Sequence, residues 1–147
     1  MTADNPPLTL TLASDLRLLP VARAFVEAAC QVAGFDGAAA HAVVLAADEA
    51  SNNIIRHAHR NDGGKLFHIR IYLSADAVEV QLIDEGPPFD LSAVPELDPG
   101  ELRVGGRGVF LMRTLMDEVS CQPYGARGNL LRLVKRRPQP SAAAGPT

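Results

Sequence analysis

The feature that most constrains the fold of this 147-residue chain is a pair of alternating segments separated by a short turn. Apolar side chains alternate with polar ones over residues 67–73, and the same period of two returns over residues 78–82. Such alternation predicts strands with one buried face, and the turn at 74–77 predicts that they pair as an antiparallel hairpin. A sheet of this kind needs helices from elsewhere in the chain to cover its apolar face.

The remaining elements follow from the same reading of periodicity. Apolar residues at helical spacing predict helices over about 16–33, 38–60 and 108–117, with Asp36 as the cap of the second helix. Further strands are predicted at 8–12, 119–124 and 130–135. The order β-α-α-β-β-α-β-β predicts an α+β two-layer sandwich, in which a mixed, mostly antiparallel sheet carries its helices on one face. We expect one domain over residues 1–136 and a flexible tail over 137–147.

Composition excludes several classes of function. The formal net charge is −3 and no sustained basic run occurs, which argues against direct nucleic-acid binding. No stretch approaches the roughly 20 apolar residues of a membrane span, and no signal peptide is visible. Cys30 and Cys121 lack metal-ligand spacing. We expect reduced thiols in a cytoplasmic protein, with a disulfide as the alternative.

Three polar residues follow one another at intervals of four in the second predicted helix. Glu49, Asn53 and His57 therefore share one stripe beside the apolar face. A carboxylate at a cleft edge can accept a proton, and an amide oxygen can hold Mg²⁺, which prefers oxygen ligands. The alternative is a solvated helix face, with His57 as a structural histidine.

A second signal stands at the end of the second hairpin strand. Asp84 continues the two-residue spacing of the core-facing residues of that strand. Its carboxylate therefore points inward if the strand extends to residue 84. A buried carboxylate needs a donor, such as an adenine amino group, and Gly86 lets a ligand approach the backbone. The alternative is a strand that ends at Ile83, followed by a simple turn.

A glycine cluster opens the third predicted helix. Gly105, Gly106 and Gly108 precede its apolar residues, where free backbone N–H groups and the helix dipole favour phosphate. The stretch from 87 to 105 has no periodicity and four prolines, which is typical of a functional lid. A flexible hinge is the alternative explanation for the glycines.

The order and separation of these signals resemble the Bergerat ATP-binding fold of the GHKL superfamily, which includes histidine-kinase catalytic domains and type II topoisomerases. In detail, DEASNNIIRHA, IDEGPPFD and GGRGVFLMRTLMDEV look like the bacterial anti-sigma-factor serine/threonine kinases of partner-switching systems. The resemblance covers about residues 8–136.

The resemblance implies a role for each matching residue. Glu49 is implied as the general base that receives the proton of the substrate hydroxyl, and Asn53 as the ligand of Mg²⁺ that bridges the ATP phosphates. Asp84 is implied as the acceptor of the adenine amino group, in a pocket shaped by Gly86. Positioning and charge neutralisation are the main needs of phosphoryl transfer.

The same resemblance assigns the phosphates to the glycine cluster. Gly105, Gly106 and Gly108 are implied to cradle them, with residues 91–105 as the ATP lid. One departure is Pro88, where the family often has the second glycine of Asp-x-Gly-x-Gly. Because proline cannot donate a backbone N–H, the lid geometry of this chain is expected to differ.

The implied partners are a sigma factor, which the family sequesters, and a small antagonist protein, which it phosphorylates on serine or threonine. Family members are commonly dimers, and Arg23 matches a position used for partner contact. The main hypothesis is therefore an ATP-dependent protein kinase and anti-sigma factor. The alternatives are a sequestering module with little kinase turnover and, ranked lower, a fragment of a sensor histidine kinase.

Overall fold

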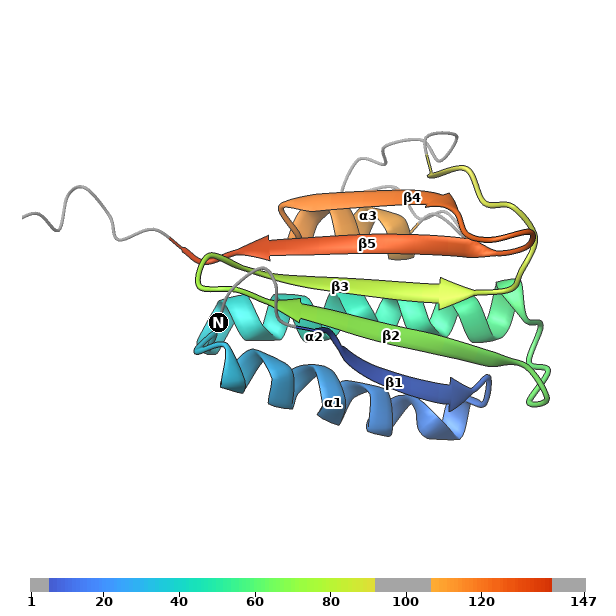
Figure 1. The fold of residues 1–147 in the computed structure, drawn as a ribbon, viewed down its shortest axis with the longest axis horizontal. Coiled ribbons are helices and arrows are strands. Elements are labelled where there is room, and N and C mark those ends of the chain that lie inside the picture. Colours follow the sequence, from blue (N-terminus) through green and yellow to red (C-terminus); the bar gives the residue numbers. More distant parts are fainter. Residues whose placement is uncertain (1–5, 92–106, 139–147) are drawn as a thin grey trace, which may run out of the picture.

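The computed structural model describes residues 6–91 and 107–138, and they form two layers (Figure 1). One layer is a five-stranded sheet in the order β1-β2-β3-β5-β4, and all four of its strand pairings are antiparallel. The strands are β1 Leu8–Ala13, β2 Leu66–Leu73, β3 Ala77–Asp84, β4 Glu118–Pro123 and β5 Asn129–Arg136. The predicted α+β sandwich is confirmed, and the described residues contain no parallel pairing.

The second layer consists of helices that lie together on one face of the sheet (Figure 1). A 3-10 turn, η1 Leu16–Leu18, leads into α1 Leu19–Val32, and α2 Gly37–Asn53 continues into a π-helical turn, η2 Ile54–Ala58. The third helix is α3 Arg107–Leu115. The predicted second helix therefore exists, but its last turn widens to π geometry, which occurs frequently at functional sites.

The core lies between the sheet and α2. Alternate residues of β2 and β3 are buried, and Phe67, Ile69 and Val80 among them are at most 1% exposed. They face a stripe of α2 that is rich in alanine, including Ala46 and Ala50. Since alanine is a strong helix former with a minimal side chain, the stripe lets α2 approach the sheet closely.

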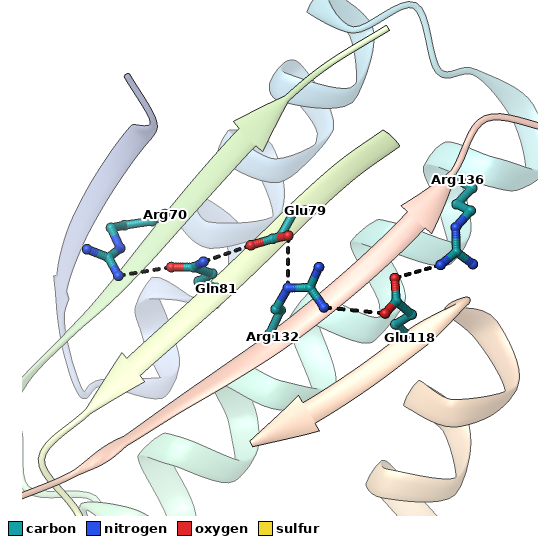
Figure 2. Close-up of polar contacts among 6 residues, drawn as sticks. All are labelled: Arg70, Glu79, Gln81, Glu118, Arg132 and Arg136. Carbon is teal, nitrogen blue, oxygen red and sulfur yellow. Dashed lines mark hydrogen bonds and ion pairs between the residues drawn. The ribbon is translucent and has the colours of Figure 1, made fainter. Parts of the chain in front are cut away.

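The face of the sheet opposite the helices carries a ladder of charged and polar side chains (Figure 2). Hydrogen bonds and ion pairs of 2.7–3.5 Å link neighbours in the order Arg70, Gln81, Glu79, Arg132, Glu118 and Arg136. Three apolar residues on the same face, Ile83, Leu130 and Val134, are nevertheless at most 7% exposed. The long side chains of the ladder explain how apolar residues stay covered without a second helical layer.

Two local expectations need correction. Asp36 stands at the N-cap position of α2, but its side chain makes no capping hydrogen bond. Arg137, assigned to the tail, is anchored instead: its guanidinium donates to the carbonyls of Ala33, Gly34 and Ala75. The rest of the predicted tail, from residue 139, lies outside the described residues.

Within residues 6–91 and 107–138, no helix combines the length and apolar character needed to cross a membrane. Both cysteines are free thiols, Cys30 fully buried and Cys121 partly exposed.

Candidate nucleotide-binding site

A cavity of about 290 Å³ opens where α2 and α3 meet the ends of β3 and β5. Its walls are mainly apolar side chains, including Ala50, Ile54, Val109, Met112 and Leu131. The polar groups that line it are Asn53, His57, Asp84, Cys121 and Asn129. Apolar walls with a few convergent polar groups are the usual composition of a small-molecule site, and the volume is near the lower end of their range.

Asp84 is the last residue of β3 and is only 7% exposed. The strand therefore extends past Ile83, and the alternative of an earlier strand end is wrong. The Oδ1 atom of Asp84 accepts the backbone N–H of Gly86 at 2.7 Å and the Nδ2 of Asn129 at 3.1 Å. Among the described residues nothing donates to Oδ2, so this oxygen is available to a donor in the cavity.

Gly86 lies where no side chain fits. A Cβ atom placed there would be 2.6 Å from the Cβ of Ala58 in η2, closer than real Cβ contacts allow. The π-helical turn and the loop after β3 are therefore in direct contact, and the glycine is needed for packing as much as for ligand access.

Asn129, which the sequence analysis did not single out, ties the loop together. Its Nδ2 donates to Asp84 and to the carbonyl of Pro87 at 2.9 Å, and its Oδ1 accepts the backbone N–H of Phe89 at 3.0 Å. The preceding Gly128 has a φ of +112° and packs against the backbone of Asp84. The only sequence signal near Asn129 was its place just before the strand predicted at 130–135.

Three residues predicted for phosphate transfer meet at the start of α3. A Cβ atom on Gly108 would lie 2.9 Å from Nδ2 of Asn53 and 3.2 Å from Oε2 of Glu49. The glycine thus allows the first turn of α3 to pack directly against an amide and a carboxylate of α2. His57 lines the same cavity from an exposed position. Gly105 and Gly106, and the predicted lid from residue 92, lie outside the described residues.

Cys121 brings a thiol to the cavity wall from β4. Burial raises the pKa of this thiol, and the nearby carboxylate of Asp84 adds to the effect. The side chain is therefore a neutral wall of the site at neutral pH.

Arg23 lies outside the cavity. Its Nε donates to Oδ1 of Asp48 at 2.7 Å, which links α1 to α2 one residue before Glu49. Among the described residues, its ion-pair partner is thus Asp48 rather than Glu27, which is four residues further along α1. The side chain of Arg23 remains 48% exposed, so a partner can still reach it.

The chain is similar to known proteins over most of its length. Residues 12–135 match the family model described as the histidine kinase-like ATPase domain. The serine-protein kinase RsbW of Listeria innocua is 29% identical over 127 residues, which cover 81% of each chain. The serine-protein kinase RsbW of Oceanobacillus iheyensis is 30% identical over 107 residues, covering 67% of this chain and 68% of that protein.

A solved structure shows the same fold. The RsbU and RsbW domains of a Mycobacterium tuberculosis protein match with a TM-score of 0.64 and 20% identity, over 90% of this chain and 32% of that one. At this identity the likeness supports the architecture alone.

Proposed function

The chain belongs to the family of histidine kinase-like ATPase domains, and from that premise we propose that it is an ATP-dependent protein-serine/threonine kinase that also acts as an anti-sigma factor. The observation that carries this proposal is that Asn53 lines the same cavity as Asp84 and also meets Glu49 at Gly108, at the start of α3. Pure sequestration of a partner does not require a carboxylate base beside a phosphate cradle.

The cavity fits the base of ATP. The free Oδ2 of Asp84 is an acceptor in a mainly apolar cavity, which suits an exocyclic amino group. Because Gly108 has no side chain, the first turn of α3 packs directly against Asn53 and Glu49, and backbone N–H groups at a helix start favour phosphate. We assign Gly86 to the adenine pocket, and Gly105 and Gly106 to the phosphate cradle with Gly108.

Mg²⁺ would be held mainly by the nucleotide. Among the described residues, no group of three or more His, Cys, Asp or Glu side chains is placed to hold a metal. Mg²⁺ commonly binds through one or two protein oxygens with phosphates and waters, and Asn53 supplies such an oxygen. When bound, the ion neutralises phosphate charge during transfer.

The residues of this chain would act as follows. Glu49 accepts the proton of a serine or threonine hydroxyl on the antagonist. The hydroxyl oxygen then bonds to the γ-phosphorus, and ADP leaves. Asp84 and the apolar walls orient the nucleotide. Arg23 contacts the sigma factor or the antagonist on a surface formed by α1. We further propose a cytoplasmic location and a homodimer.

Kinase activity is tested by mixing the purified chain with ATP, Mg²⁺ and a candidate antagonist taken from the same genome. The expected product is antagonist whose serine or threonine is heavier by one phosphate in the mass spectrum. Glu49→Gln is the matched control, because it keeps the side-chain shape but removes the base. ATP binding and antagonist capture with no phosphate transferred would contradict the kinase and leave a sequestering module.

A further inference from the structure

His59 is a buried histidine that no part of the proposed chemistry uses. It follows directly after η2 and is only 1% exposed. Its Nδ1 lies 2.5 Å from Oγ of Ser14, just past β1, and its Nε2 lies 3.2 Å from the backbone nitrogen of Glu85. One imidazole therefore links the end of β1 to the residue between Asp84 and Gly86.

The partners of His59 fix its tautomer. A backbone N–H can only donate, so Nε2 must be unprotonated to accept the bond from Glu85. The proton of the neutral ring then sits on Nδ1 and is donated to Oγ of Ser14. A second proton would turn Nε2 into a donor that faces the Glu85 N–H, and that hydrogen bond would be lost.

The surroundings of His59 favour the neutral ring. Burial lowers its pKa from the ordinary value of 6.5. The carboxylate of Asp84 opposes this shift, Lys65 reinforces it, and the carboxylates of Glu85 and Asp62 oppose it more weakly. The ring is thus neutral at pH 7 and takes up a proton only in acid.

We propose that His59 is a positioning residue for the nucleotide: its neutral form holds the backbone of Glu85, and with it Asp84 and Gly86, in the adenine-binding arrangement, so that acidification weakens nucleotide affinity through this side chain. The proposal rests on the proposed function, because it assumes that Asp84 receives adenine. It adds a pH dependence of nucleotide affinity that does not involve Glu49 or Gly108.

The first test compares ADP affinity of the wild type and His59→Gln by calorimetry at pH 7.5, 6.5 and 5.5. Glutamine can accept the Glu85 N–H through Oε1, but it does not titrate. The pH dependence of ADP itself is common to both proteins and cancels in the ratio of their affinities. We expect similar affinities at pH 7.5 and, by pH 5.5, a wild-type affinity that has fallen further than that of the variant, by at most about tenfold, which an imidazole with the ordinary pKa of 6.5 would give. His41→Gln, on the exposed start of α2, is the matched control and should follow the wild type.

Folding must be checked at each pH. A histidine whose pKa is lowered by folding binds more protons in the unfolded chain, so stability falls as the pH drops below about 6.5. Circular dichroism therefore has to show a folded protein before affinities are compared. A purely structural role would lower the melting temperature in acid and leave the affinity ratio of the folded proteins constant, which would overturn the proposal.

The second test uses the wild type alone and does not depend on a variant that folds. Linkage is reciprocal, so a nucleotide that prefers the neutral ring must lower the pKa of His59 when it binds. Titration of the imidazole C–H signals by NMR, with and without saturating ADP, should show this downward shift. An unchanged or raised pKa would refute the positioning role, whereas a wild type that binds no ADP at pH 7.5 would overturn the proposed function itself.

Discussion

Replacing Asp84 with asparagine should change which base the cavity prefers. Both protein donors, Gly86 N–H and Asn129 Nδ2, reach the same oxygen of Asp84. In Asp84→Asn the amide oxygen will therefore occupy that position, because an amide nitrogen there would face two donors. The NH₂ group then points into the cavity, where the proposed ligand presents the adenine amino group.

ATP affinity should fall because the substitution replaces a hydrogen-bond acceptor with a donor opposite the adenine amino group. A hydrogen bond to a charged group contributes roughly 1.5–3 kcal/mol, so ATP affinity should fall about 10- to 100-fold. Inosine triphosphate carries a carbonyl where ATP carries the amino group, and the new NH₂ can donate to it. The ratio of ATP affinity to inosine triphosphate affinity should therefore fall in the variant.

Calorimetry with the two nucleotides measures this ratio directly. Asp76→Asn is the matched control, because it removes the same charge at the turn before β3, at the opposite end of that strand. Thermal melting should show Asp84→Asn close to the wild type, since both of its protein hydrogen bonds survive. An unchanged nucleotide ratio would mean that Asp84 does not contact the base, whatever its effect on stability.

Three further predictions address Glu49, Cys121 and the exposed Arg23. Glu49→Gln should slow phosphoryl transfer to the antagonist about 10²- to 10⁴-fold while ADP affinity measured by calorimetry stays unchanged; a normal rate would remove the base from the mechanism. Arg23→Ala should weaken capture of the sigma factor or antagonist in a pull-down without changing ADP affinity, and equal capture of both would show that its pair with Asp48 is only structural. ATP should protect Cys121 from iodoacetamide at pH 8.5, with buried Cys30 unlabelled throughout; equal labelling of Cys121 with and without ATP would place the nucleotide elsewhere.

The hairpin of the sheet was predictable because apolar and polar residues alternate along its strands. One face of β2 and β3 is buried, so apolar residues recur at every second position, and this period also placed Asp84 on the inner face. The placement of Glu49 and Asn53 was predictable for a similar reason, since residues four apart share a helix face. These inferences need only the local chain.

The supports of the site were not predictable, because each depends on contacts between distant segments. Asn129 reaches Asp84 only because β5 pairs with β3 in one particular register. Arg23 pairs with Asp48 across two helices, although Glu27 was nearer in sequence. The π-helical turn of η2 leaves no clear mark in the sequence, yet it sets where His59 lies.

The loop that presents Asp84 is held from two sides, and the two supports differ in kind. On the β5 side, Asn129 uses an uncharged amide group that does not itself titrate. On the β1 side, His59 provides one acceptor that a proton removes. An asparagine or glutamine at position 59 would have given a support of constant strength. With His59, the hydrogen bond to the Glu85 N–H forms only when the imidazole is neutral. The hydrogen bonds of Asn129 hold the same loop from the other side. Acid should therefore weaken nucleotide affinity while the loop stays folded.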